Sequence, residues 1–398
     1  MFHLLVLLLG CGAAQAQSFE EAVRAARLAD AQYAAQRATV DGRRLQARQA
    51  WGAFLPSASA GYSRTDSGGS GKTSLSLTQP LLSYDRYLTL QQSDPLAALA
   101  QAEARQADSD LILRVHTAMA EIVRQRESMR SLGVQIDGLQ EQYRRALRLR
   151  ELGQGTVTEV SDFEVRVAVA QGNRVNMQTA LQTAVRSFTL LTGLTPDVAR
   201  LALTLPQTGA EPADALAAAA VARSSAPAPV SARLNLELTR IAARRVKAQY
   251  LPELSVQAGY SQSAGAAAVS QTRLGFNVNL PLNAGGYYQF QQAELDLVRA
   301  QENLRFAEDS AASDAARLHQ TVAALAEEVQ IRKRALDGAR LAVDANLKSY
   351  LGGVKTNIDV VTSYQIQADA EVALVGSELA RGEARLRLAL LVNDRVLP

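Results

Sequence analysis

The sequence predicts a mainly α-helical protein with a small β part, built from two copies of one structural half. Aromatic residues make up only 5 % of the 398 residues, which suits long helices better than a compact mixed core. Apolar residues recur at spacings of three and four over long stretches. Landmarks of the first 200 or so residues return in the same order in the rest of the chain, which indicates a tandem duplication.

The duplication rests on five pairs of landmarks, each about 200 residues apart. The pairs are Pro56 and Pro252, Pro80 and Pro281, Gly153 and Gly353, Glu159 and Asp359, and the segments "LLTG" (190–193) and "LLVN" (390–393). A period of this length is too long for a solenoid repeat. We therefore predict a first half over 17–194 and a second over 230–398, joined by a proline-rich linker or equatorial segment over 195–229.

The first sixteen residues are predicted to be an export signal. The apolar run "LLVLLLGCGAAQA" is too short to span a bilayer and ends in Ala14-Gln15-Ala16, a small-x-small cleavage pattern. Leu8-Leu9-Gly10-Cys11 also resembles a lipoprotein cleavage box, which would leave a lipidated Cys11. Both outcomes stay open.

Each half continues with a helix and then a β-hairpin. The helices are expected over 18–52 and about 230–249, and the hairpins over 56–82 and 252–282. In the hairpins, apolar and small polar residues alternate between Gly/Ser-rich turns, a pattern typical of strands. The alternating apolar residues are Leu75, Leu77, Leu254, Val256, Ala258, Tyr260, Leu274, Phe276, Val278 and Leu280.

Strands of about nine residues match the height of a membrane-spanning β-strand. Four such strands with open edges cannot cross a membrane alone, because their edge backbone groups would lack partners in lipid. If the hairpins enter a membrane, several chains must contribute to one barrel. The alternative is an exported, non-conducting coiled coil that organises the cell envelope and carries two small hairpin caps.

Two long helices then complete each half. They are expected over about 86–150 and 156–192, and again over about 287–350 and 356–391, with a kink at Asp94-Pro95. Apolar residues at helical spacing indicate helices packed side by side. Examples are Leu132, Ile136, Leu139, Tyr143 and Ala146, and in the second half Leu336, Ala339, Val343, Leu347 and Tyr350.

Turns at 150–160 and 350–360 connect the long helices. Gly352 and Gly353 are expected to end one helix, and Thr356 or Asn357 to cap the next. Asp359 then lies in the first helical turn, where the helix dipole favours an acid. Glu159 has the same place in the first half.

Over about 18–393 the sequence resembles the TolC family of outer membrane efflux and secretion channels. The resemblance rests on the duplication, on "LP" before each first strand, on "TQPLLS" and "LPLNAGG", on two "G-x₅-[DE]-V" turns and on "LLTG". It implies a homotrimer, a shared twelve-stranded β-barrel in outer membrane lipid, and an α-helical barrel that crosses the periplasm. It also implies a periplasmic adaptor and an inner-membrane pump or ABC transporter as partners of a passive exit duct.

The resemblance further implies a periplasmic gate at the helical turns. Tyr350 matches the gate tyrosine, Lys355 stands where an arginine is usual, and Asp359 matches an acidic ring. Thr362 stands where a second ring aspartate is expected, which leaves one acidic ring and implies weaker cation selectivity. Thr158 and Glu159 match the positions that tie to the gate. The turn glycines implied for adaptor docking are Gly153, Gly155, Gly352 and Gly353.

Charge gives this gate a physical basis. Three Asp359 side chains around a narrow axis would repel each other and hold cations. A pair between Lys355 and Glu159 is expected to link the two helical hairpins, although an exposed ion pair contributes only about 0–1 kcal/mol.

The sequence lacks the motifs expected for nucleic-acid binding, phosphate binding, metal binding or catalysis. The net charge of +3 is spread without a basic run, which disfavours nucleic acid as a partner. "GGSGKTS" (68–74) fails as a phosphate loop because Asp66 occupies the first glycine position and a strand follows. His116 and His319 lack metal-ligand partners at helical spacing, so we expect them to pack on helix faces. We predict no enzyme activity, no metal and no cofactor.

Overall fold

A computed structural model describes residues 18–64, 71–201, 203–205, 212–264, 269–281 and 285–392. The predicted signal segment 1–16, with Cys11, lies outside them. The chain forms two compact units. Unit 1 comprises Met1–Ala34, Asp108–Val221 and Ser313–Pro398, and unit 2 comprises Ala35–Ala107 and Ala222–Ala312.

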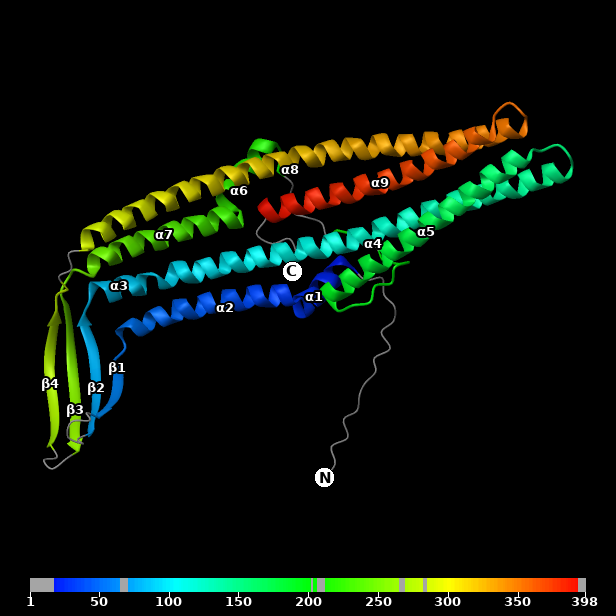
Figure 1. The fold of residues 1–398 in the computed structure, drawn as a ribbon. Coiled ribbons are helices and arrows are strands. Elements are labelled where there is room, and N and C mark those ends of the chain that lie inside the picture. Colours follow the sequence, from blue (N-terminus) through cyan, green and yellow to red (C-terminus); the bar gives the residue numbers. More distant parts are fainter. Residues whose placement is uncertain are drawn as a thin grey trace, which may run out of the picture. The chain divides into compact units, whose positions relative to one another are not determined.

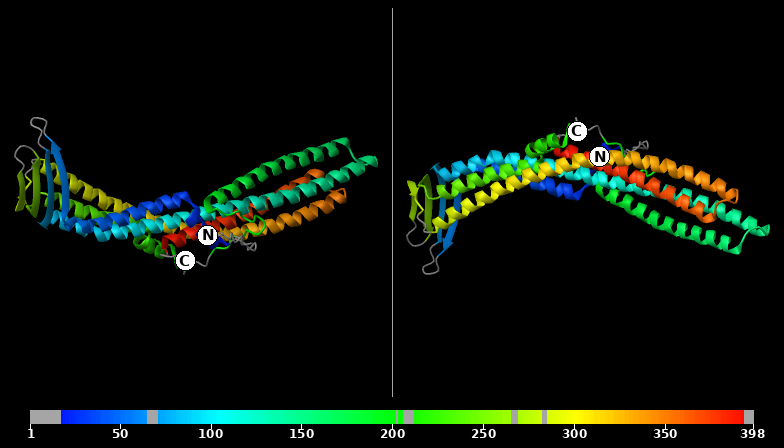
Figure 2. Two further views of the ribbon diagram at one scale, coloured as in Figure 1. Left: turned by 90° about the horizontal axis from the view of Figure 1, so that it is seen from below. Right: turned by 90° about the horizontal axis from the view of Figure 1, so that it is seen from above.

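Unit 2 holds one antiparallel sheet of four strands, in the order in which they occur in the chain. The strands lie side by side in Figures 1 and 2: β1 (Ser57–Arg64), β2 (Gly71–Leu82), β3 (Glu253–Ala264) and β4 (Val269–Asn279). Both predicted hairpins are thus confirmed, and β2 pairs with β3 to join them into one sheet.

The strand register gives the sheet one apolar and one polar face. One row across the sheet contains Ala58, Leu77, Ala258 and Leu274. The next row, on the opposite face, contains Ser59, Ser76, Gly259 and Arg273. The apolar face is uncovered in the single chain, since Leu274 and Phe276 are 79 % and 77 % exposed.

Helices of unit 2 connect to the strands. They are α2 (Ala31–Trp51), α3 (Tyr84–Gln91), α7 (Pro227–Ala248) and the first parts of α4 (Ser93–Glu151) and α8 (Gly286–Leu351). The predicted kink at Asp94-Pro95 is a break between α3 and α4. Pro95 lies in the first turn of α4, where its missing N–H has no helical partner to lose.

Unit 1 contains two helical hairpins, α4 with α5 (Val157–Thr192) and α8 with α9 (Asn357–Val392). In Figure 1 each pair lies side by side, cyan with green and orange with red. The helix α1 (Phe19–Ala29) contacts α5. Large side chains that are fully buried in this unit include Phe19, Leu111, Met119, Ile122, Phe163, Phe188 and Leu386.

Two predicted boundaries differ from the structure. The helix expected over 18–52 divides at Asp30, because the Asp30 carboxylate accepts a hydrogen bond from the Tyr33 N–H and so starts a new helix. The linker expected over 195–229 is partly helical. It contains α6 (Ala215–Ser225), and α7 begins at Pro227, a residue well suited to a first helical turn.

No helix in the described part of the chain is both long and apolar enough to cross a membrane.

Candidate functional site

The two hairpin turns have the same backbone structure, as the duplication predicts. Gly153 and Gly353 both have a φ of +73°, a conformation that favours glycine. In the first turn the Gln154 N–H donates to the Leu149 carbonyl, with 2.8 Å between N and O. In the second, the Val354 N–H donates to the Ser349 carbonyl at 3.0 Å. The backbone thus ends both long helices in the same way.

The turns differ in sequence at several equivalent positions, among them Gly155, which corresponds to Lys355. A Cβ added to Gly155 would lie 2.9 Å from the Arg150 backbone nitrogen. The Gly155 N–H donates to Leu149 at 3.0 Å, whereas the Lys355 N–H donates to Ser349 at 3.4 Å. The second turn is therefore slightly more open, which makes room for a side chain.

A threonine directly precedes the helix after each turn. The Thr156 hydroxyl accepts a hydrogen bond from the Glu159 N–H at 3.2 Å. In the second turn the Thr356 N–H and hydroxyl both donate to the Asp359 carboxylate, at 2.9 and 2.8 Å. Thr356 thus directly precedes the first residue of α9, Asn357, and both acids lie in the first helical turn as predicted.

A tyrosine connects the two hairpins of unit 1. The Tyr350 hydroxyl, at the end of α8, donates to Glu159 Oε1 on α5 at 2.8 Å. The Arg145 guanidinium of α4 lies 5.6 Å from the centre of the Tyr350 ring, a cation–π distance. Burial, and then the Glu159 carboxylate, raise the pKa of Tyr350 to about 12. The phenol therefore stays protonated and donating at physiological pH.

The predicted pair between Lys355 and Glu159 is wrong. The Lys355 Nζ lies 3.6 Å from Asp359 Oδ1, one helical turn further along its own chain segment. Glu159 is held by Tyr350 instead. The backbone N–H of Thr356, its hydroxyl and then Lys355 lower the pKa of Asp359. Thr158 is exposed beside Glu159.

Further along the hairpins from the turns, α4 contacts α9, and the sequence did not predict this contact. We call the line of contacts between these two helices the seam. Gln135 Nε2 donates to Gln365 Oε1 at 2.5 Å, and the Ser131 hydroxyl donates to the Ala368 carbonyl at 3.3 Å. The ring of Tyr364 lies so close to Gly138 that an added Cβ would come within 2.8 Å of it. The Tyr364 ring can pack here because Gly138 has no side chain.

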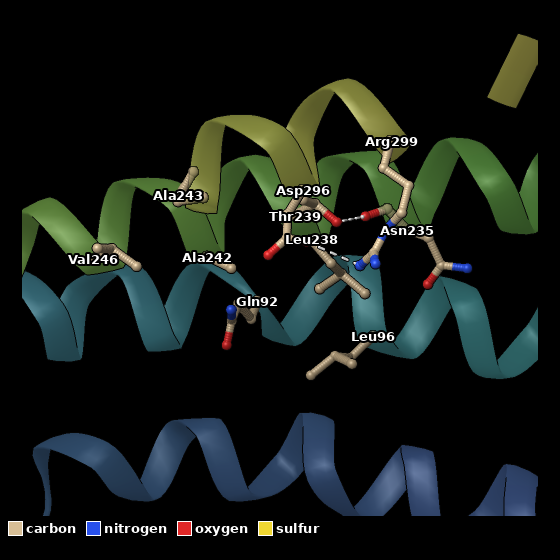
Figure 3. Close-up of a pocket in the computed structure, with 11 residues that line it drawn as sticks. Gln92, Leu96, Asn235, Leu238, Thr239, Ala242, Ala243, Val246, Asp296 and Arg299 are labelled. Carbon is tan, nitrogen blue, oxygen red and sulfur yellow. Dashed lines mark hydrogen bonds and ion pairs between the residues drawn. The ribbon is translucent and has the colours of Figure 1, made fainter. Parts of the chain in front are cut away.

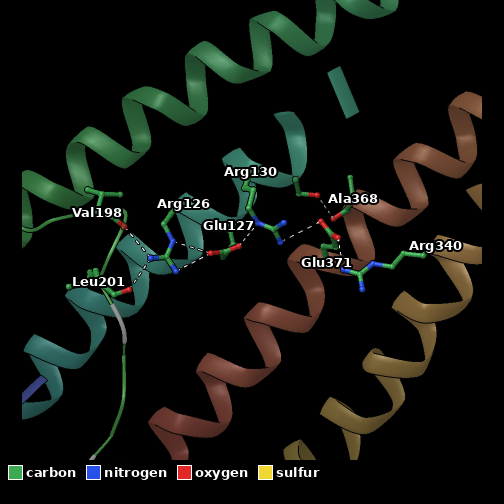
Figure 4. Close-up of polar contacts among 9 residues, drawn as sticks. Arg126, Glu127, Arg130, Val198, Leu201, Arg340, Ala368 and Glu371 are labelled. Atoms are coloured by element: carbon green, nitrogen blue, oxygen red, sulfur yellow. Dashed lines mark hydrogen bonds and ion pairs between the residues drawn. The ribbon is translucent and has the colours of Figure 1, made fainter. Parts of the chain in front are cut away.

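A chain of charged groups continues this seam (Figure 4). Arg126 donates to the carbonyls of Val198 and Leu201, at 3.1 and 2.9 Å, and pairs with Glu127. Arg130 bridges Glu127 and Glu371. Arg340 of α8 donates to Glu371 from the other side at 3.0 Å.

Glu371 is only 8 % exposed, and the two arginines pair with its carboxylate. The chain of charges links the segment after α5 to α4, α9 and α8.

A cavity of about 430 Å³ in unit 2 carries no comparable chemistry (Figure 3). Its lining includes Leu96, Leu238 and Val246. Asp296 and Arg299 at its edge pair with each other at 3.0 Å. The part of the chain that the structure describes also contains no group of three or more His, Cys, Asp or Glu placed to hold a metal ion.

Unit 1 contains antiparallel helical hairpins, and unit 2 contains a sheet with one apolar and one polar face. These features can be compared with those of known protein classes. Residues 219–394 match the family model described as outer membrane efflux protein. The resemblance predicted from the sequence is thus confirmed as a similarity to the TolC-like outer membrane channels.

Two curated proteins illustrate this similarity. The chain is 27 % identical over 315 residues to the proteases secretion protein PrtF of Dickeya chrysanthemi, with 74 % of this chain and 66 % of that protein covered. It is 23 % identical over 377 residues to outer membrane protein TolC of Escherichia coli, covering 87 % and 76 %. This chain thus spans about two thirds to three quarters of the length of these relatives.

The fold is also that of a solved channel. The Campylobacter jejuni CmeC outer membrane channel has a TM-score of 0.79 and 14 % identity, with 94 % of this chain and 85 % of that chain covered.

Proposed function

We propose that this chain is the outer membrane exit channel of a tripartite efflux pump or a type I protein secretion system. It acts as a passive gated duct through which cargo crosses the periplasm and the outer membrane. The observation that carries this proposal is the sheet of unit 2, which exposes an apolar face and a polar face in the same chain. An apolar face suits lipid, and a polar face suits a water-filled passage.

The sheet also implies more than one chain. Strands β1 and β4 are the edges of the sheet within one chain. Backbone N–H and C=O groups at such edges need partners inside a bilayer. Copies of the same chain supply them when β4 of one copy pairs with β1 of the next. Three copies give the homotrimer and the twelve-stranded barrel that the family resemblance implies.

The hairpin turns are the proposed docking site for the periplasmic adaptor. Apolar side chains are exposed there, since Leu152 is 71 % and Val354 is 82 % exposed. Val157 and Ile358 are also exposed at the start of the next helices. Such a group of exposed apolar residues favours contact with another protein. The inner-membrane pump or ABC transporter behind the adaptor supplies the energy.

The gate is proposed at the same turns. The contact from Tyr350 to Glu159, with Arg145 on the Tyr350 ring, holds the α8/α9 hairpin against the α4/α5 hairpin. Opening requires this contact to break in each copy. Asp359 would then form one acidic ring, while its hydrogen bonds to Thr356 and its pairing with Lys355 reduce its effect on passing cations.

Single-channel conductance of the purified protein in a planar bilayer tests the channel and its gate. We expect a small cation-preferring conductance that grows in Tyr350→Phe, which removes only the hydroxyl that reaches Glu159. Tyr287→Phe is the matched control, because that hydroxyl contacts Gln291 within α8 itself. No conductance from folded and inserted protein would contradict the channel and favour a non-conducting envelope protein. Equal conductance in all three proteins would place the gate elsewhere.

A further inference from the structure

We propose that Arg273 and Lys72 form a cationic band on the polar face of the sheet that attracts anions and opposes cation entry. The band would be a second determinant of ionic selection, separate from the acidic turn at Asp359. This inference rests on the proposed function, in which the polar face lines the passage.

The strand register puts Arg273 on the polar face. Arg273 lies opposite Gly259, and Gly259 lies opposite Ser76 on the next strand. Glycine has no side chain and serine has a short one, so the guanidinium is the longest group in its row. Arg273 is exposed, and its Nη2 donates to Gln271 Oε1 on its own strand at 2.8 Å. That amide is neutral and leaves the positive charge in place.

Lys72 adds a second positive charge on the same face, nearer the hairpin loops. Its register partners are Ser63 on β1 and Ser263 on β3, which carry no charge. Arg64, the last residue of β1, belongs by its register to the apolar face and is not part of this band. The band therefore consists of Arg273 and Lys72.

Acidic residues are almost absent from the sheet. Within the described residues of β1–β4, the only acid is Glu253, the first residue of β3 at the end that adjoins the helices. Its carboxylate accepts a hydrogen bond from the Ser83 hydroxyl at 2.6 Å. The rest of the polar face thus carries positive charge only.

Distance decides how far this charge acts. Adjacent strands are about 4.8 Å apart, so an ion above Ser76 is about 10 Å from the Arg273 backbone. The Debye length is about 10 Å at 0.1 M salt and about 30 Å at 0.01 M. At low salt, each copy of Arg273 should therefore change the local concentration of a monovalent ion by about twofold.

The first test is the reversal potential across a potassium chloride gradient at low ionic strength. We expect Arg273→Gln to raise the permeability ratio of potassium to chloride about fourfold, since the two ions change about twofold in opposite directions. Arg273→Lys should keep the wild-type ratio because it keeps the charge. Gln271→Ala should also keep it, because it removes only the neutral partner. An unchanged ratio in Arg273→Gln would overturn the proposal.

The second test needs no current. Ser76→Cys, in a Cys11→Ser background, places the single thiol in the row of Arg273. The measurement is the ratio of its labelling rates by anionic and cationic methanethiosulfonates in membrane vesicles at low salt. We expect Arg273→Gln to lower this ratio about fourfold, since both rates change about twofold in opposite directions.

The two tests separate the two claims. An unchanged labelling ratio in Arg273→Gln would overturn the cationic band even if the protein conducts. If no variant conducts, the proposed function fails, and a fourfold change in labelling would still support the charge on this face.

Discussion

At the scale of single residues, the contact that joins the two hairpins involves a different donor from the one expected. Glu159 was correctly predicted to be tied to the second turn, but its partner is Tyr350 and not Lys355. The Lys355 side chain reaches Asp359 one helical turn away, a local contact that needs no second hairpin. Tyr350 lies before the turn, at the end of α8, and its side chain reaches α5 of the neighbouring hairpin.

Asp30 provides a test of residue-scale energetics in unit 1. Its carboxylate accepts from Arg114 Nη2 at 2.6 Å and its side chain is 11 % exposed. Burial alone would raise its pKa, but hydrogen bonds from Arg114 and the Tyr33 N–H hold the pKa below the ordinary 3.8. We expect Asp30→Asn to reduce the free energy of unfolding at neutral pH by about 1–3 kcal/mol.

The pH dependence of that difference follows from the lowered pKa. The stabilisation by Asp30 is complete above the unfolded-state pKa near 3.8 and is lost as pH falls through the lower folded-state value. Thermal unfolding followed by circular dichroism should therefore show the two proteins converging below about pH 4. Asp41→Asn is the control, since its pair with Arg44 is exposed and contributes little. A difference that persists at low pH would contradict this account.

At the scale of elements, the duplicated turns gave the most reliable prediction. Gly153 and Gly353 were expected to end helices, and both adopt the same left-handed conformation. The seam between α4 and α9 was not foreseen. Gly138 lies inside a long helical pattern and carries no local signal, because its role depends on Tyr364, more than two hundred residues away.

The two adjacent glycines of the second turn are a matched pair. Gly353 has a φ of +73°, so Gly353→Ala should destabilise the turn by about 1 kcal/mol. At Gly352 a new Cβ would lie 3.6 Å from the Ser349 carbonyl, an ordinary contact, so Gly352→Ala should be tolerated. The measurement is the rate of protease cleavage at the turn. Equal rates for the two variants would show that the backbone conformation does not limit this turn.

At the scale of the whole molecule, the sheet decides the environment of the protein. Phe276 and Asn277 are neighbours on β4, but their side chains belong to opposite faces. An arginine on the lipid side of a barrel costs about 2–4 kcal/mol near the bilayer centre.

We therefore expect Phe276→Arg to reduce the yield of protein that resists extraction from outer membranes, while Asn277→Arg keeps it. Membrane fractionation with and without detergent measures this yield. Equal yields for the two variants would contradict a membrane position for the apolar face.

The two hairpins, the long helices and the turns between them could be predicted from the sequence alone. These features follow from short-range patterns: alternation in strands, three- and four-residue spacing in helices, and glycine with threonine or an acid at helix ends. Two features were not predicted from these patterns. The Asp30 side chain starts a new helix within a continuous helical pattern. Alanines form the helix α6 within the proline-rich segment.

The side chains that meet from distant parts of the chain could not be predicted in this way. The contact between Tyr350 and Glu159, the packing of Tyr364 on Gly138, and the arginines around Glu371 join residues far apart in the chain. The register of β2 against β3 likewise placed Arg273 in a row with Ser76. Such contacts depend on how elements pack and pair in space, and the local periodicity of a sequence carries no information about that.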